Sequence, residues 1–270
     1  MIKIKNYKKV DSLEEAWELN QKRTNRIIGG MLWVKMSSAN VQTAIDLSGL
    51  GLDQIEETEE EFRIGCMVTL RQMELHEGLE SYTEGAVKEA FRHIVGVQFR
   101  NLATVGGSLF GRFGFSDVLT LLLALDCDVE LYKGGIMSVQ KFVKLKRDND
   151  ILMHIIIKKT PVHVCYQSVR NTVTDFPTLN LAAAVLKDKL RISIGARPGK
   201  AMLFEDEAGQ LNGLTEGKVT EEKIRTFAKE IKEKLPTGSN MRGSAKYRSH
   251  LVEVMTVRAL HALGGERIAD

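Results

Sequence analysis

The sequence predicts an α+β protein built from two parts, and two features of the residue pattern support this fold class. Up to about residue 160, segments with helical spacing of apolar residues alternate with short apolar runs typical of strands. Beyond that point, strand-like runs come first and two helical segments close the chain. The chain has 270 residues, enough for one large domain or two ordinary ones. We therefore expect one domain over 1–160 and a second, a small antiparallel sheet packed with helices, over 161–270.

Each element of the first part has a local signal. Ser12 and Glu15 have the spacing of a capping box, in which a hydroxyl and a carboxylate each satisfy a free amide of the first helical turn. Thr69 and Gln72 repeat that spacing, and Ser116 or Asp117 can cap a strongly apolar helix. The expected helices are 12–23, a short one after Thr69, 86–95 and 118–126, and the expected strands are 26–28, 43–47, 62–67 and 128–132.

The second part is expected to hold more strand pairs. The runs 151–158 and 162–169, separated by Lys159-Thr160-Pro161, suggest a hairpin, and a helix fits 179–186. Strands over 190–194 and 201–205 are expected to pair. Thr220 and Ser244 are the predicted caps of the last two helices. The final helix is expected to turn Tyr247, Leu251, Val254 and Met255 inward and to stop at Gly264-Gly265.

Composition excludes several classes of function. The formal charge is only +3, from 38 basic and 35 acidic residues, so neither nucleic acid nor a membrane surface is an expected partner. No apolar run approaches the roughly 20 residues that cross a bilayer, and no signal-peptide pattern opens the chain, so a cytoplasmic location is expected. Three scattered cysteines predict neither a disulfide framework nor an iron–sulfur cluster, and the histidines show no metal-binding spacing. Redox chemistry would need an organic cofactor or a partner.

Two diglycine turns are the strongest candidates for a binding site. Gly29-Gly30 follows a short strand, and Gly106-Gly107 lies between two hydroxyl residues, Thr104 and Ser108. Glycine permits close approach of a ligand to the backbone, and successive amides in such a turn form an anion nest. Neither turn matches a Walker loop or a GxGxxG fingerprint. The residues alone leave two alternatives open, a tight turn and a phosphate-binding turn. Asp117 is likewise either a ligand for sugar hydroxyls or an ordinary helix cap.

A long segment resolves this choice by resemblance. Residues 93–126, HIVGVQFRNLATVGGSLFGRFGFSDVLTLLLALD, resemble the FAD-binding subunit of molybdopterin dehydrogenases, the family of xanthine dehydrogenase and carbon monoxide dehydrogenase flavoproteins. The family's hallmark is R-N-x-A-T/S-x-G-G-N, then S-D, then an apolar helix. The matching residues are Arg100, Asn101, Ala103, Thr104, Gly106, Gly107, Ser116 and Asp117. Residues 27–30 resemble the family's first flavin loop and residues 244–260 its C-terminal end, so the resemblance covers nearly the whole chain.

The resemblance implies a fold, a cofactor and partners. The first domain would be a two-subdomain FAD-binding fold of the PCMH type, divided at about 1–57 and 58–160, and the second a carbon monoxide dehydrogenase flavoprotein-like domain. The chain would pass electrons from iron–sulfur clusters on a partner, through FAD, to NAD+ or another acceptor. Its partners would be a molybdenum-cofactor subunit and an iron–sulfur subunit of a xanthine-dehydrogenase-like enzyme. No general acid or base would be required from this chain.

The resemblance also implies the cofactor-binding residues. Two loops would bind the pyrophosphate and its sugars, and these loops comprise Ile27, Ile28, Gly29, Gly30, Met31, Leu32, Trp33, Ala103, Thr104, Gly106, Gly107, Ser108, Phe110 and Gly111. Ser116 and Asp117 would hold ribityl or ribose hydroxyls. Ile94, Val95 and Phe99 would line the adenine and ribose pocket. Leu152 and Tyr166 would close over the isoalloxazine.

The chain departs from the family pattern at three places. Met31-Leu32 replace the usual Thr-Asp, so only backbone contacts carry over there. Ser108 replaces a common asparagine, and the loop GRFGF over 111–115 is more aromatic and more basic than usual. Arg112 in that loop is expected to be solvated. The loss of Thr-Asp leaves an alternative from another class, a flavin-free scaffold that retains the fold.

Overall fold

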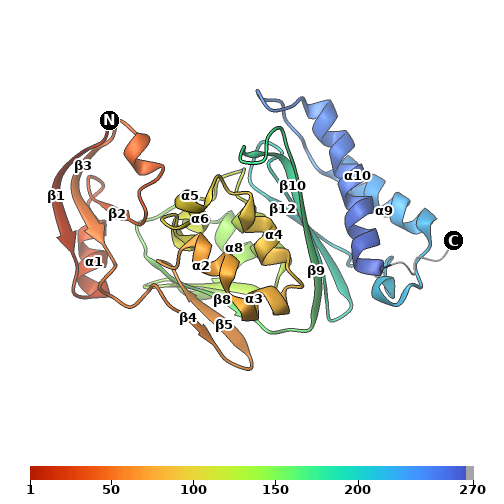
Figure 1. Ribbon diagram of the computed structural model, residues 1–270, viewed down its shortest axis with the longest axis horizontal. Helices are drawn as coiled ribbons and strands as arrows, with labels where there is room; N and C mark the ends of the chain where they lie inside the picture. The colour runs from red at the N-terminus through yellow and green to blue at the C-terminus, as the bar shows by residue number, and fades with distance from the viewer. Residues whose placement is uncertain (266–270) are drawn as a thin grey trace. The chain divides into compact units, whose positions relative to one another are not determined.

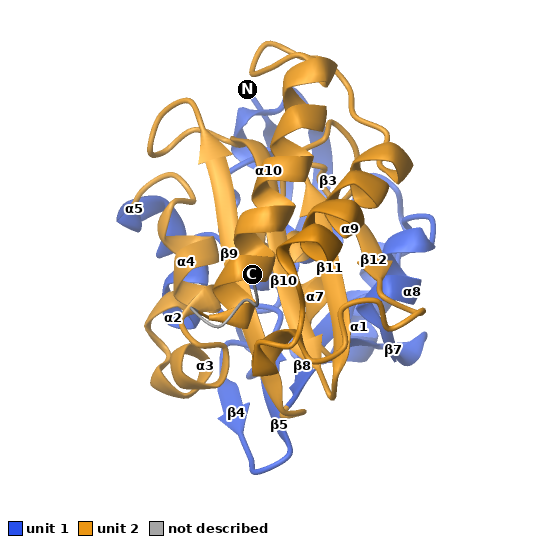
Figure 2. Cartoon of the chain, turned by 90° about the vertical axis from the view of Figure 1, so that its right-hand side faces the viewer, with its two compact units in different colours: residues 1–73, 97–111, 127–158 blue, residues 74–96, 112–126, 159–270 orange. Residues whose placement is uncertain are grey.

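The computed structural model describes residues 1–265, and the chain folds into two compact units (Figure 2). Unit 1 contains Met1–Met73, Val97–Gly111 and Cys127–Lys158. Unit 2 contains Glu74–Gly96, Arg112–Asp126 and the C-terminal segment from Lys159. Each unit is therefore assembled from three separate stretches of chain. The predicted division near residue 160 is a different partition and stays a prediction.

Unit 1 holds two sheets. Strands β1 (Lys3–Lys9), β3 (Asn40–Asp46) and β2 (Arg26–Ile28) form a parallel sheet in the order β1-β3-β2, and helix α1 (Leu13–Asn20) contacts its β2 and β3 (Figure 1). The second sheet is antiparallel, in the order β4-β5-β8-β6-β7. Its strands are β4 (Ile55–Glu57), β5 (Glu61–Gly65), β8 (Leu152–Lys158), β6 (Cys127–Leu131) and β7 (Gly135–Ser138).

The remaining elements of unit 1 are short. They are η1 (Val34–Met36), α5 (Val97–Arg100), α6 (Val105–Phe110), α8 (Val139–Lys144) and the start of α2 (Leu70–Leu75). The predicted capping box at Thr69 and Gln72 is confirmed, whereas the one at Ser12 and Glu15 is only half formed, because the Glu15 carboxylate accepts from the Asp11 amide, at 3.0 Å, and not from that of Ser12. The Glu15 amide donates to Ser12 Oγ, and the Gln72 side chain accepts from the Thr69 amide at 2.8 Å while Thr69 Oγ1 accepts from the Gln72 amide at 3.2 Å. These caps fix where α1 and α2 begin.

Unit 2 is built on one antiparallel sheet in the order β12-β11-β10-β9. The strands are β9 (Val162–Arg170), β10 (Pro177–Leu186), β11 (Lys189–Gly195) and β12 (Met202–Glu205). The helices are α3 (Glu77–Tyr82), α4 (Ala86–Arg92), α7 (Asp117–Ala124), η2 (Leu214–Glu216), α9 (Glu221–Lys234) and α10 (Ala245–Gly264). Figure 1 shows α9 and α10 against one face of this sheet and α4 on the other side. Thr220 and Ser244 cap α9 and α10 as predicted.

Three predictions about the second half are wrong. Residues 177–186 form the central strand β10 and not a helix, because both faces of the strand are covered and no residue pattern separates an inside from an outside. Strands β8 and β9 do not form a hairpin, since β8 pairs with β5 and β6 whereas β9 pairs with β10. Tyr247 is 45% exposed and does not face inward, although Leu251 and Met255 do.

Helix α7 is buried along its whole length, as its apolar sequence predicts. It contacts β10 and β11 on the face opposite α9 and α10. Residues of β10 alternate between the two faces: Leu181 and Ala183 join the core under α9 and α10, while Asn180 reaches α7. No helix within residues 1–265 is both long and apolar enough to cross a membrane.

Candidate cofactor site in unit 1

The two diglycine segments predicted from the sequence lie against the same short stretch of unit 1. A Cβ built on Gly30 would stand 1.8 Å from the carbonyl oxygen of Leu102, and one on Gly29 would stand 2.6 Å from Thr104 Oγ1. A Cβ atom cannot approach a backbone oxygen as closely as 1.8 Å, so position 30 requires glycine, whereas a Cβ at position 29 would require the Thr104 side chain to move. The turn after β2 is therefore packed directly on the segment that leads into α6.

The first turn has amides that the fold itself does not use. Strand β2 ends at Ile28, η1 begins at Val34, and Met31 has a positive φ of 58°. Among residues 1–265, no group accepts a hydrogen bond from the amides of Gly29, Gly30, Met31 or Leu32. A bend with successive unused amides is the arrangement that binds anions such as a pyrophosphate.

The second turn is different, and the structure corrects the reason for its glycines. The Val105 amide donates to the Val68 carbonyl at 2.8 Å, and the Gly106 amide donates to the Cys66 carbonyl at 3.0 Å. The Gly107 amide donates to Thr104 Oγ1 at 3.2 Å. The prediction that the Gly106 and Gly107 amides are free to bind an anion is therefore wrong, because both amides already donate to acceptors within the protein.

Close packing explains Gly106 instead. A Cβ on Gly106 would lie 2.6 Å from both Cβ and the carbonyl oxygen of Cys66, which follows β5. Gly107 has more room, since its built Cβ would approach only Thr104 Oγ1, at 3.1 Å. Thr104 caps α6, and the Ser108 hydroxyl donates to the Thr104 carbonyl at 3.1 Å. Thr104, Gly106 and Ser108 thus form a closely packed wall next to the first turn.

Aromatic and apolar residues border the two turns. Trp33 is 41% exposed and meets Phe99 of α5 edge to face, with ring centroids 6.4 Å apart. The structure therefore brings Trp33 and Phe99 together, as a shared binding role requires. Phe110 packs on Phe142, at 6.0 Å between centroids, and Leu152 is 5% exposed within β8, so both also serve the core of unit 1.

The other predicted binding residues belong to unit 2. Ile94 and Val95 follow α4, and Val95 has a positive φ of 53° and a partly exposed side chain. Ser116 caps α7 by accepting from the Leu119 amide at 3.1 Å. Arg112 is buried, with 5% exposure, so the expectation of a solvated arginine is wrong.

Asp117 lies at the centre of a buried polar network. Its Oδ1 accepts hydrogen bonds from Arg170 at 2.7 Å, from Asn180 at 3.0 Å and from the Tyr166 hydroxyl. The side chains of Arg170 and Asp117 are 7% and 6% exposed. Burial, and then the negative charge of Asp117, raise the pKa of Tyr166 well above its usual value, so the phenol stays protonated and donates.

Sequence reasoning missed most of this network. Arg170 and Asn180 carry no local signal, because Arg170 directly follows the predicted strand 162–169 and Asn180 is an ordinary polar residue within the predicted helix 179–186. Only the antiparallel pairing of β9 with β10 and the packing of α7 on β10 bring them to Asp117. In this arrangement Tyr166 and Asp117 bind each other, and their contact with a cofactor stays a prediction.

Burial also determines the reactivity of two cysteines. Desolvation raises the pKa of the Cys66 thiol, beside Gly106, to about 12, and that of Cys165 to about 12. Thiol reagents attack the thiolate, so the folded protein should leave both cysteines unmodified at pH 8 for much longer than the urea-unfolded protein does. Peptide mass spectrometry after timed alkylation measures this. Rapid labelling of Cys66 in the folded chain would show that the wall around Gly106 is open.

Comparison with known proteins places the chain in a family. Residues 2–160 match the FAD binding domain in molybdopterin dehydrogenase, and residues 164–263 match the CO dehydrogenase flavoprotein C-terminal domain. The chain belongs to this family of molybdopterin dehydrogenases, which are oxidoreductases, and FAD is its cofactor. The resemblance inferred from the sequence and the α+β fold of FAD-binding and antiparallel-sheet domains are both confirmed.

The similar proteins cover almost the full chain. YgfM of Escherichia coli K12 is 25% identical over 260 residues, covering 93% of each chain. The nicotine 6-hydroxylase medium subunit of Paenarthrobacter nicotinovorans is 25% identical over 272 residues, covering 94% of this chain and 95% of the relative. A carbon monoxide dehydrogenase structure from Hydrogenophaga pseudoflava has a TM-score of 0.84 at 20% identity, over 98% of both chains, and shows the shared fold.

Proposed function

We propose that the chain is the FAD-carrying electron-transfer subunit of a molybdenum hydroxylase. The close contact of Gly29-Gly30 with Leu102 and Thr104, which leaves unused amides over residues 29–32, carries this proposal. The family membership and the medium-subunit names of the relatives support it.

The residues of unit 1 suit an anionic dinucleotide. The amides of Gly29, Gly30, Met31 and Leu32 would donate to the pyrophosphate oxygens, so the missing Thr-Asp side chains are not needed for that contact. Trp33 and Phe99 offer an aromatic edge for a ring of the cofactor. Bound FAD supplies electron transfer in steps of one or two electrons, and the protein contributes binding, orientation and the exclusion of water.

The proposal includes partner chains. Metal ligands are not clustered within residues 1–265, and two of the three cysteines are buried, so iron–sulfur clusters and molybdenum would be held by other subunits. We extend the proposal to a xanthine-dehydrogenase-like, cytoplasmic enzyme that passes electrons to NAD+ or another acceptor. Affinity purification of the tagged chain from its own cells, followed by FAD, iron and molybdenum analysis, tests this. We expect all three in one complex of fixed stoichiometry; the tagged chain purified alone, without iron or molybdenum, would contradict the partner proposal.

Replacing Gly107 with valine separates cofactor binding from folding. The built Cβ at Gly107 meets only one side-chain atom, whereas at Gly106 it meets the backbone of Cys66. Gly107→Val should therefore keep the circular dichroism spectrum of the parent but lose FAD on dialysis, since the added side chain would begin 3.1 Å from Thr104 Oγ1, the same atom that borders Gly29 of the first turn. Gly106→Val should instead lower the melting temperature markedly. If the Gly107→Val protein retained bound FAD, Gly107 would not be part of the cofactor site.

A further inference from the structure

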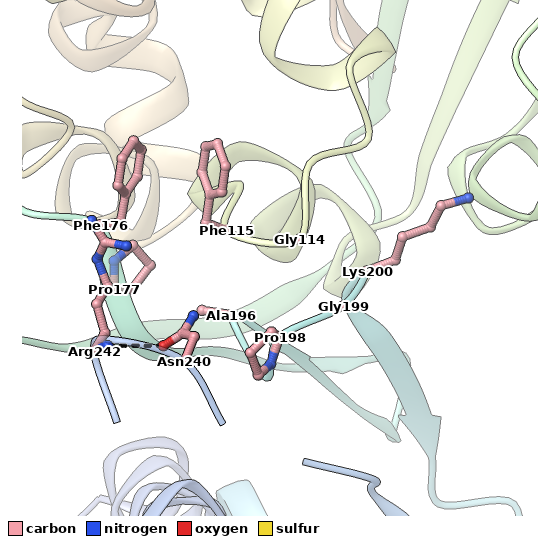
Figure 3. A pocket seen from close by; sticks show the side chains of 10 residues that line it. All are labelled: Gly114, Phe115, Phe176, Pro177, Ala196, Pro198, Gly199, Lys200, Asn240 and Arg242. Carbon is pink, nitrogen blue, oxygen red and sulfur yellow. Dashed lines mark hydrogen bonds between the residues drawn. The ribbon is translucent and has the colours of Figure 1, made fainter. Parts of the chain in front are cut away.

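Unit 2 contains a cavity of about 400 Å³ that none of the predicted cofactor residues lines (Figure 3). Its walls come from the loop before α7, the start of β10, the segment after β11 and the segment before α10. They are Gly114, Phe115, Phe176, Pro177, Ala196, Pro198, Gly199, Lys200, Asn240 and Arg242. This volume lies within the range of small-molecule sites.

One wall of the cavity is aromatic. Phe115 and Phe176 lie with ring centroids 4.3 Å apart, and Phe113 stacks on Phe115 at 5.3 Å with an interplanar angle of 7°. The guanidinium of Arg242 lies 4.8 Å from the centre of the Phe176 ring. Figure 3 shows both rings beside each other on the same side of the cavity. Such a wall favours a planar, unsaturated ligand over an aliphatic one.

Hydrogen-bond donors lie next to the aromatic wall. Asn240 Oδ1 accepts from Arg248 at 2.6 Å and from the Arg242 amide at 2.9 Å, so the orientation of this side chain is fixed. Its Nδ2 has no acceptor among residues 1–265, and Figure 3 shows this nitrogen turned away from Arg242. Arg242 donates hydrogen bonds from Nε and Nη2 to Asp175. Its Nη1 has no acceptor among residues 1–265.

The surroundings of the cavity are positively charged. Arg248 is completely buried and donates to the carbonyls of Thr178, Ala196, Gly238 and Gly243 and to Asn240, with no carboxylate among these partners. Burial lowers its pKa, as it lowers that of Arg197, whose donors also go to carbonyls. Lys200 and Arg242 also line the cavity. Within residues 1–265, Asp175 is the only carboxylate that forms an ion pair with any of the three arginines Arg197, Arg242 and Arg248. The charge that is left uncompensated favours an anion.

The shape of the cavity depends on the unusual GRFGF loop. A Cβ on Gly114 would lie 2.5 Å from the Gly199 carbonyl oxygen, and the Ala196 amide donates to the Gly114 carbonyl at 2.7 Å. The loop is therefore held against the segment after β11. This contact positions Phe115 at the cavity. The loop 111–115, which departs from the family pattern, therefore helps to form the cavity wall.

We infer that this cavity binds a planar aromatic anion, with its ring against Phe115 and Phe176 and its carboxylate or phosphate at Arg242 and Asn240. The inference rests on unit 2 alone and does not depend on the proposed flavin site. Two sources of this chemistry are an aromatic carboxylate and a purine nucleotide.

Calorimetric titration of the FAD-loaded chain with four probes tests the inference. Nicotinate and AMP carry the charge, and nicotinamide and adenosine are their neutral counterparts. We expect one charged probe to bind about ten- to a hundredfold more tightly than its counterpart, which corresponds to a hydrogen-bonded charge. Which probe binds identifies the source.

Two variants locate the binding. Arg242→Met should weaken binding of the charged probe to the level of its neutral counterpart, and Phe115→Leu should weaken both members of the pair. Arg225→Met, which removes the same charge from the exposed face of α9, is the matched control and should change nothing. The inference is overturned if no charged probe binds, if Arg225→Met acts as strongly as Arg242→Met, or if the probes bind only the FAD-free chain, which would assign the cavity to the flavin. The flavin absorbance of the same samples reports the proposed function separately.

Discussion

Replacing Gly30 with alanine is expected to abolish tight FAD binding. The new Cβ would stand 1.8 Å from the Leu102 carbonyl, and neither backbone segment can yield without separating the first turn from the wall before α6. The amides of residues 29–32 would then lose their position. We expect FAD affinity to fall about tenfold or more, the equivalent of one hydrogen bond to a charged group, and the free energy of unfolding to fall by about 1–3 kcal/mol.

A second glycine of unit 1 provides the control. Gly51 has a φ of 71° and no atom near its built Cβ, so Gly51→Ala adds backbone strain of about 1–2 kcal/mol but moves nothing at the turns. FAD titration and urea unfolding of both variants separate the two effects. If Gly30→Ala and the parent bound FAD with equal affinity, close packing of the two turns would not be required for binding.

Replacing Asp117 with alanine should cause the largest loss of stability. The substitution leaves the Arg170 guanidinium, which is 7% exposed, without its carboxylate, and it removes the acceptor of Tyr166 and Asn180. Breaking a buried ion pair from one side costs about 3–5 kcal/mol. Urea unfolding at pH 7 measures this loss of free energy.

Tyr166→Phe is the matched variant for that experiment. It removes one donor from Asp117 but leaves Arg170 and Asn180 in place, so it should cost only about 1 kcal/mol. If Asp117→Ala were no more destabilising than Tyr166→Phe, the carboxylate would not be the centre of the network. The role of Asp117 would then be limited to placing a negative charge in the first turn of α7, which Ser116 caps.

Local signals in the sequence were reliable where the chemistry is local. Capping residues set the starts of α1, α2, α9 and α10, and the apolar run after Ser116 forms the buried helix α7. The segment 177–186 was misread because a strand covered on both faces shows no alternation. Strand β1 was missed for the opposite reason: it lies at the edge of its sheet, is almost entirely exposed and carries four lysines.

The candidate site shows the same limit. The order of residues around Gly106-Gly107 was enough to predict FAD, but its physical explanation was incomplete. Those amides bond to Cys66, Val68 and Thr104, and the unused donors lie in the other turn. Which amides remain free depends on contacts between segments far apart in the chain, such as Gly106 with Cys66 and Gly30 with Leu102, and these contacts leave no mark in the local sequence.

A fluorescence titration of the purified chain with FAD tests the central claim most directly. Parent protein should bind one FAD per chain, and Gly30→Ala should weaken that binding while Gly51→Ala leaves it unchanged. Parent protein that shows no affinity for FAD would contradict the account and would favour a flavin-free scaffold that retains the fold.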